Sequence, residues 1–457
     1  MAESLDQFLS DFSSFAWGLP LLILLIGGGI YLGFLSSFAP LTLTGKAIKQ
    51  LIQHATKKED KTEHHFSPFQ ALTTALASTI GMGNIAGVAV AISIGGPGAI
   101  FWMWISAIVG MITKFFTCSL TIMFKKKMAD GTYEGGPMYF IEVGLGKKWK
   151  PLALSFAAFG LVGAFPVFNV NQLTQATKDI LLFPQGVDNS FMTNMIIGLV
   201  LTLLTAAVIL GGLKRIGQTS EKFVPVMVIL YFVSVVYIIF SSTSEIIPTI
   251  KLIFSEAFNP TFYKGSPFLG GSLGGLILLG IRRGAFSNEA GIGTADLAHG
   301  SSSQEEPIKE GMSAMLGPLI DTLIVCTLTA LAILITGVWQ TSADSGVTLT
   351  LRAFEHAMPG FGSYVLLMCI FVFSFSSLFS YSFYGSKCTA YLFGKQNAHW
   401  YQYVYLASII IGATTSLNMM INLIDGFYAL MAIPTMTGTI LLAPHVVRRL
   451  KEKKHLL

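Results

Sequence analysis

A run of small and polar residues interrupts a long apolar segment near the start of the chain. The segment spans residues 68–94, and the interruption runs from Ser78 to Asn84, with glycine at positions 81 and 83. Glycines weaken a helix, and irregular backbone at membrane depth is tolerated only beside protein or a polar cavity. Unwinding here would free carbonyls for a cation, with Asn84 offering another oxygen, and would expose amides that attract a carboxylate. The alternative is that Gly83 and Gly87 only let two helices pack closely.

A second glycine-rich interruption is predicted in the other half of the chain, near Gly280 to Gly293. It contains Arg282, Arg283 and Glu289, and charged residues inside a span point to function by default. We expect one of the arginines to pair with Glu289 in a gate or a structural lock. The alternative is that the span ends early and that these charges lie at the cytoplasmic surface.

Paired interruptions in corresponding halves of a chain are typical of secondary transporters, which bind their substrate between the two breaks. The residues that follow the arginines suit such a pocket. Gly284, Phe286 and Ser287 are expected to line it, with the phenyl ring closing over a small side chain.

Two other segments carry polar groups of interest. The span near 151–175 ends with several amides, and amides in hydrocarbon need partners, so we expect Asn171 or Gln172 to contact the substrate. The alternative is that these amides satisfy backbone groups near a helix end. Glu134 precedes a Gly-Pro bend in a cytoplasmic segment, where it could gate the inner side or belong to an ordinary loop.

The composition indicates what must position these residues. The chain has 457 residues, of which 53% are hydrophobic and 12% are charged, about half the charge of a soluble domain. We therefore predict an all-α polytopic membrane protein with about 11 transmembrane helices of roughly 20 residues each. The expected spans are 17–36, 68–94, 98–124, 151–175, 191–212, 222–243, 270–298, 310–338, 362–386, 400–421 and 424–446.

The distribution of basic residues predicts the orientation. Most of the 29 lysines and arginines fall in alternate loops and in the carboxyl-terminal tail, which the positive-inside rule places in the cytoplasm, with the amino terminus outside. Because each half then contains an odd number of spans, the second half must be inverted relative to the first. Two inverted five-helix repeats, each led by an interrupted helix, are typical of the leucine-transporter class.

The predicted organisation has five parts. They are an amino-terminal helix and cytoplasmic loop (1–66), a first five-helix repeat (67–245), an extracellular connection (246–269), an inverted second repeat (270–446) and a basic cytoplasmic tail (447–457).

Three motifs carry a resemblance to a known family. Residues 78–87, 133–139 and 283–293 resemble the motifs of the alanine or glycine:cation symporter family, in the same order and over nearly the whole chain. The resemblance implies uptake of small amino acids driven by Na⁺, and sometimes by H⁺, across the plasma membrane of a prokaryote. It also implies the leucine-transporter-type core that the two interruptions indicate independently.

The first motif is similar to the unwound helix of leucine transporters, and this similarity implies two sodium sites. One would use the Thr79 carbonyl and the Asn84 side chain. The other would use the carbonyls of Ala77 and Ile80 with hydroxyls from the span near 362–386, namely Ser376 and Ser377. The residues expected at the substrate are Thr79, Gly81, Gly83, Asn171, Gln172, Gly284, Phe286, Ser287 and Tyr381.

Departures from the family's pattern affect the expected substrate. Asn171 and Leu173 stand where many members have glutamine and asparagine, and Ser380 to Ser386 differs from the usual Gly-Trp-Ser-Tyr-Tyr-Gly-Glu. We expect Na⁺-coupled uptake of a small neutral amino acid, alanine or glycine first. The alternative is a proton-coupled or uncoupled permease of the same fold for serine or glutamine.

Other classes fit the sequence poorly. A membrane-embedded enzyme would need paired carboxylates or metal ligands, and a nutrient sensor would usually carry a soluble domain. We therefore expect no enzymatic activity, no organic cofactor and no nucleic-acid partner, and we expect a protein that works as a monomer among lipids.

Overall fold

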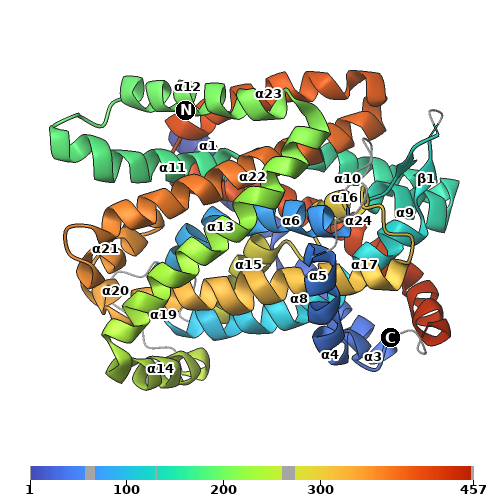
Figure 1. Cartoon of the computed structure of the whole chain (residues 1–457), viewed down its shortest axis with the longest axis horizontal. Coiled ribbons are helices and arrows are strands. Elements are labelled where there is room, and N and C mark those ends of the chain that lie inside the picture. The colour runs from blue at the N-terminus through green and yellow to red at the C-terminus, as the bar shows by residue number, and fades with distance from the viewer. Residues whose placement is uncertain (1, 57–66, 129–130, 260–272, 454–457) are drawn as a thin grey trace.

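The computed structural model of the chain describes residues 2–56, 67–128, 131–259 and 273–453. Nearly all of the described chain is helical (Figure 1). The lysine- and histidine-rich end of the predicted cytoplasmic loop, 57–66, lies outside the described residues. The same holds for residues 260–269 of the predicted extracellular connection and for 454–457 of the basic tail.

The amino-terminal region forms a bent helix followed by two shorter ones. The helical stretches Ser4–Ala16 and Leu19–Leu35 meet at 45°, and Trp17 and Gly18 lie at the bend. The elements are α1 (Ala2–Ala16), α2 (Leu19–Leu22), η1 (Ile23–Gly27), α3 (Gly28–Leu35), α4 (Ala39–Thr42) and α5 (Thr44–Thr56).

The first predicted interruption is a break between two helical segments. α6 (Pro68–Thr79) starts with a capping box, in which Ser67 and Gln70 each accept a hydrogen bond from the other's backbone. η2 (Gly83–Gly87) and α7 (Val88–Gly95) continue the chain at 48° to α6. Between them, Ile80 and Gly81 are not helical.

The rest of the first half contains four long helical regions and a small hairpin. In the hairpin, Lys126 pairs with Glu134 in antiparallel register. The elements are α8 (Gly98–Met123), β1 (Lys126–Lys127), β2 (Tyr133–Glu134), α9 (Pro137–Leu145), η3 (Lys147–Trp149), α10 (Lys150–Gly163), α11 (Val167–Thr177), η4 (Lys178–Leu182), η5 (Phe183–Gln185), α12 (Phe191–Ile209), α13 (Gly212–Ser241), η6 (Thr243–Glu245) and α14 (Ile246–Phe258).

The second half also begins with a broken helix. α15 (Leu273–Asn288) is followed by the non-helical residues 289–293 and by the short α16 (Thr294–His299). The remaining elements are α17 (Pro307–Ala314), α18 (Leu316–Pro318), η8 (Leu319–Cys326), α19 (Thr327–Ile335), α20 (Val338–Thr341), α21 (Val347–Ala357), α22 (Gly362–Phe393), η9 (Lys395–Asn397), α23 (Ala398–Thr414) and α24 (Leu417–Glu452).

This second break is shorter than the sequence predicts. Residues 280–288 remain helical, and only residues 289–293 leave the helix. Gly280 and Gly284 serve close packing against α8, since an added Cβ would lie 2.4 Å from Trp102 Cβ and 2.8 Å from Ser106 Cβ respectively. Gly284 faces α8 in this structure, and its place in the substrate pocket stays a prediction.

The outer surface carries many large apolar side chains, and buried polar side chains gather at the two breaks. Large exposed apolar side chains lie on α12 and α13, including Leu203, Val226 and Phe240, whereas the two broken helices are buried near the middle of the structure (Figure 1). Among the described residues, seven helices are long and apolar enough to span a membrane, or up to nine if each bent pair is one span. The prediction of a polytopic helical membrane protein is confirmed, while eleven spans and the inverted repeats stay predictions.

Candidate functional site

The break after α6 lies directly against α22. The Ser377 hydroxyl donates to the Ala77 carbonyl at 3.1 Å and lies 3.4 Å from the Ser78 carbonyl. The Ser376 hydroxyl lies 3.3 Å from the same Ala77 carbonyl. At Gly81 an added Cβ would lie 2.4 Å from Ser377 Oγ, so only glycine allows this approach. The structure thus brings together three of the groups expected at the second sodium site.

A fully buried carboxylate joins the two broken helices. Asp321 in η8 accepts hydrogen bonds from Asn84 Nδ2 at 2.7 Å, from Ser287 Oγ at 2.8 Å and from Thr322 Oγ1 at 2.6 Å. The Asn84 oxygen accepts from the Gly81 amide at 2.9 Å, which fixes the side chain across the break. Asn84 and Ser287, predicted from different motifs, therefore meet at one acidic group.

The second break places Glu289 at the centre of a buried hydrogen-bond network. Its φ of +55° is in the left-handed region, which non-glycine residues adopt rarely and at a cost of about 1–3 kcal/mol. Its carboxylate accepts from the hydroxyls of Tyr381 and Thr294, and from Tyr428 at 3.2 Å. At Gly293, with φ +101°, an added Cβ would clash with Thr435 and its neighbours.

A small cavity lies between the two breaks. Phe286 closes one side, with its ring centre 5.2 Å from that of Phe168 and 5.7 Å from that of Tyr428. The cavity volume is about 20 Å³, which is room for about one water molecule, so a substrate can enter only if these rings move. It is lined by Ser78, Thr79, Gly83, Phe165, Pro166, Phe168, Asn169, Phe286, Tyr381, Ile424 and Tyr428.

Asn171 and Gln172 lie away from this cavity. Asn171 donates to the Thr415 carbonyl at 2.6 Å, and Gln172 accepts from the Val347 amide at 2.9 Å. Both line a second, larger cavity of about 410 Å³ between α11, α21 and the turn from α23 to α24. The amide of the same helix that reaches the cavity between the breaks is Asn169.

The two arginines of α15 pair with a residue of α24 rather than with Glu289. Both Arg282 and Arg283 contact Asp425, whose side chain is fully buried. Arg282 also bonds to Ser13 of α1, and Trp17 donates to the Asp425 carbonyl at 2.8 Å. The expected pairing with Glu289 is wrong because Glu289 turns away from α15 after the break.

The arginine cluster is adjacent to the cavity. The Arg283 guanidinium lies 5.2 Å from the centre of the Phe286 ring, and Ile424, beside Asp425, lines the cavity. In a separate cluster, Glu134 at the end of β2 forms an ion pair with Lys387 of α22. Each cluster connects elements from distant parts of the chain.

Comparison with known proteins identifies the family. A sequence model of the sodium:alanine symporter family matches residues 2–455. The chain belongs to this family. The sodium/alanine symporter AgcS of Methanococcus maripaludis is 39% identical to it, over 97% of this chain and 96% of that protein. The resemblance that the motifs carry is confirmed.

Relatives within the symporter family are described with different substrates. The probable sodium/glutamine symporter GlnT of Bacillus subtilis is 33% identical over 99% of this chain and 91% of its own length. The putative sodium/proton-dependent alanine carrier YrbD of the same organism is 33% identical over 98% of this chain and 92% of its own length. The family membership therefore establishes a transporter, and it leaves the amino acid open.

A solved structure supports the fold. The structure of MhsT in complex with L-phenylalanine matches with a TM-score of 0.59 at 14% identity, covering 85% of this chain and 98% of MhsT. At this identity the likeness concerns the fold alone.

Polar residues in or beside the candidate site that the sequence prediction did not assign as substrate or ion ligands include Asn169, Asp321, Asp425 and Tyr428. A signal for Asp425 exists, because it is an isolated charge in a long apolar segment, which is costly unless paired. Asn169 lies two residues before Asn171, which the sequence predicted as a contact. Which of the two amides faces the cavity depends on where α11 begins, and the bend at Ala164 to Pro166 sets that point.

Proposed function

We propose that the protein takes up a small neutral amino acid together with Na⁺ by alternating access, with alanine or glycine as the first candidates. The observation that carries the proposal is the pair of broken helices joined by Asn84, Ser287 and Asp321. Free backbone groups and a buried carboxylate suit a cation and a zwitterion that bind side by side. The family membership supports the coupling to sodium.

One sodium ion would bind between the two breaks. The Thr79 carbonyl and the Asn84 oxygen would supply neutral ligands, and Asp321 would supply a negative charge that the sequence prediction did not assign to this ion. The Asn84 oxygen already accepts a hydrogen bond from the Gly81 amide. If Na⁺ binds through this oxygen, the ion contact replaces that hydrogen bond. Asp321 favours a cation here because a buried charge needs an opposite charge.

A second sodium ion would bind between the break after α6 and α22. The carbonyls of Ala77 and Ile80 and the hydroxyls of Ser376 and Ser377 would be its ligands. The contacts between these hydroxyls and the Ala77 carbonyl, at 3.1 and 3.3 Å, support this assignment. Such a site links the broken helix to α22, so that an ion bound there stabilises the unwound backbone.

The substrate would occupy the cavity between the breaks. Amides at Gly81 and Gly83, at the start of η2, would hold its carboxylate. Phe286 and Tyr381, which line the cavity, would surround its side chain. Thr79, which lines the cavity, and Ser287, next to Phe286, would be polar contacts, and Asn169 would take the place first expected of Asn171 and Gln172.

Two charged clusters would act as gates. Arg282 and Arg283 with Asp425 would close the outer side of the cavity, and Glu134 with Lys387 would close the inner side. Their support is that the Asp425 side chain is fully buried and that the Glu134 and Lys387 side chains are mostly buried. The amino terminus outside, the carboxyl terminus inside and the plasma membrane of a prokaryote remain the proposed placement, with a monomer as the working unit.

Uptake by purified protein in lipid vesicles tests the function. With an inward Na⁺ gradient, radiolabelled alanine or glycine is expected to accumulate, and replacing Na⁺ by choline is expected to abolish accumulation. Serine and glutamine complete the panel, since GlnT is described as a glutamine symporter. Uptake that persists without Na⁺ and collapses with the pH gradient would instead support the proton-coupled alternative.

A further inference from the structure

The bent amino-terminal helix, which runs from α1 to α3, contacts both partners of an ion pair in the proposed outer gate. Trp17, at the bend, is 1% exposed, and its Nε1 donates to the Asp425 carbonyl at 2.8 Å. Arg282, which lies 2.6 Å from the Asp425 carboxylate, also donates to the hydroxyl of the buried Ser13. The Arg282 guanidinium lies 6.0 Å from the centre of the Trp17 ring, within the range of a cation–π contact.

Apolar contacts hold the amino-terminal helix in one position on α24. At Gly426, next to Asp425, an added Cβ would lie 2.2 Å from the Phe12 ring, so only glycine lets this ring approach so closely. The Phe12 ring also meets the Phe427 ring edge-on, with the ring centres 6.0 Å apart. A buried apolar cluster continues the contact along α15 and α24, and its members are Trp17, Leu21, Leu25, Ala285, Ala429, Ala432 and Met436.

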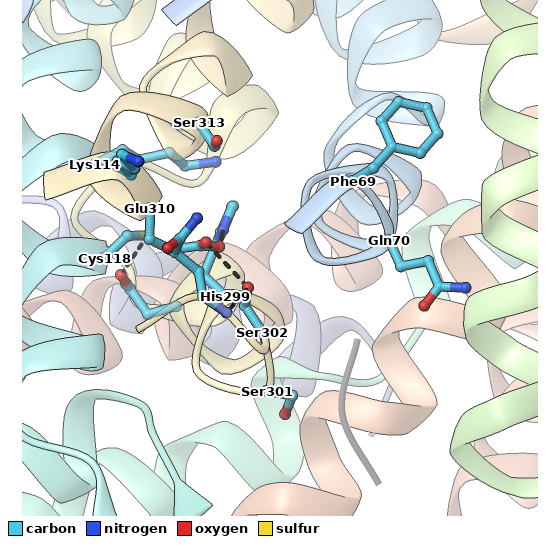
Figure 2. Close-up of polar contacts among 12 residues, drawn as sticks. Phe69, Gln70, Lys114, Cys118, His299, Ser301, Ser302, Glu310 and Ser313 are labelled. Carbon is cyan, nitrogen blue, oxygen red and sulfur yellow. Dashed lines mark hydrogen bonds and ion pairs between the residues drawn. The ribbon is translucent and has the colours of Figure 1, made fainter. Parts of the chain in front are cut away.

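The amino-terminal helix also reaches the second break. At Gly291 an added Cβ would lie 2.7 Å from Leu25 Cδ2. The far end of the broken helix has a separate attachment, because His299 Nδ1 lies 2.5 Å from Glu310 Oε1 and the Ser302 hydroxyl donates to Glu310 Oε2 at 3.0 Å (Figure 2). The broken helix is therefore held by α17 at the end of α16, and by the amino-terminal helix at the break and along α15.

Opening of the proposed outer gate would require α15 and α24 to separate. Arg282 and Arg283 lie on α15, and Asp425 lies on α24. The amino-terminal helix lies outside both predicted five-helix repeats, and it is hydrogen-bonded to both of these helices. When α15 and α24 separate, its contacts with at least one of them must break.

We propose that the amino-terminal helix is a brace of the outer gate, in which Trp17 and Ser13 are positioning residues for the ion pair between Arg282 and Asp425. Trp17 holds the Asp425 backbone through its N–H and covers the guanidinium with its ring, and Ser13 holds the same guanidinium. The brace favours the closed gate, because these contacts form only when α15 and α24 are together. The proposal rests on the proposed function, and it assigns part of the gating to a helix outside the two repeats.

Trp17→Phe tests the brace through transport kinetics. The substitution removes the N–H donor and keeps an aromatic ring in the buried position. A weaker brace populates the open gate more, and apparent affinity rises with the population of the state that binds. Loss of one hydrogen bond is therefore expected to lower the alanine concentration for half-maximal uptake about two- to tenfold. The maximal rate is expected to fall, because each cycle must close the gate again. A purely structural role would lower the maximal rate through loss of folded protein and leave half-saturation unchanged.

Ser13→Ala provides an independent variant. It removes the hydroxyl that Arg282 contacts, so half-saturation is expected to shift in the same direction as in Trp17→Phe. Ser14→Ala is the matched control, since Ser14 is the next residue of α1 and is exposed. Trp400→Phe, at an exposed tryptophan of α23, controls for loss of an indole. Both controls should behave like the unchanged protein, and equal shifts in Ser14→Ala and Ser13→Ala would refute the role of Ser13.

A labelling measurement tests the brace without transport. Phe168 lines the cavity between the breaks and is 3% exposed, and the four native cysteines are buried. In intact cells, a membrane-impermeant maleimide is expected to react with Phe168→Cys about two- to tenfold faster when Trp17→Phe is also present, since the open gate is populated more. The same increase is expected with Ser13→Ala and is expected to be absent with Ser14→Ala.

The two measurements separate failure of the brace from failure of the proposed function. If alanine uptake by the unchanged protein does not depend on Na⁺, the proposed function is refuted, while faster labelling in Trp17→Phe still supports the brace. Normal sodium-driven uptake, with half-saturation and labelling unaffected by both Trp17→Phe and Ser13→Ala, would overturn the brace alone.

Discussion

Replacing Asp321 by alanine is expected to lower sodium-dependent uptake by about a hundredfold or more, since removing one partner of a buried charge pair costs several kcal/mol. Three hydrogen bonds, from Asn84, Ser287 and Thr322, converge on this carboxylate, so the substitution affects both breaks. The measurement is the initial rate of alanine uptake in vesicles as a function of Na⁺ concentration.

Two comparisons separate loss of an ion ligand from loss of structure. Asp321→Asn keeps the shape and two hydrogen-bonding atoms, and we expect it to raise the Na⁺ concentration needed for half-maximal uptake. Asp188→Ala, in the exposed loop before α12, should leave uptake unchanged. A normal sodium dependence in Asp321→Ala would exclude Asp321 from the ion site.

Removal of Asp425 is expected to have the largest effect on stability. Two guanidinium groups share this fully buried carboxylate, and breaking a buried pair by deleting one partner costs about 3–5 kcal/mol because it leaves a buried charge uncompensated. Asp425→Asn should therefore lower the midpoint of thermal unfolding in detergent and slow uptake strongly.

The double variant Asp425→Asn/Arg283→Gln provides the control for charge. It restores the net charge of the cluster to its original value, and it should recover part of the stability lost in Asp425→Asn. If the double variant is less stable than Asp425→Asn, then specific contacts of Arg283, such as its packing over Phe286, outweigh the charge balance.

The features that follow from short-range chemistry could be predicted from the sequence. Glycine at positions 81 and 83 makes a helix less stable than alanine would, so the first break can be predicted directly from the sequence. Gly280 and Gly284 misled the prediction because glycine also serves close packing of helices, and sequence alone does not show whether α8 fills the space beside them. Only the structure distinguishes these two uses of glycine.

Long-range partners could not be predicted in the same way. Arg282 and Arg283 need an anion, but the sequence offers both Glu289 and Asp425, and the left-handed turn at Glu289 decides between them. In the same way, the bend before Val167 determines which amide side chain of α11 faces the cavity between the breaks. Residues two positions apart on a helix point to nearly opposite sides, and Asn169 and Asn171 accordingly face different cavities.

The most direct test of the central claim is the flux of sodium driven by the amino acid. The Na⁺ concentration is made equal inside and outside the vesicles, so that sodium has no gradient of its own. An inward gradient of alanine should then drive ²²Na⁺ into the lumen, because coupling between the two ligands is reciprocal. We predict that alanine-dependent ²²Na⁺ accumulation occurs in the unchanged protein and is lost in Asp321→Ala. Alanine entry without any ²²Na⁺ movement would contradict sodium-coupled symport.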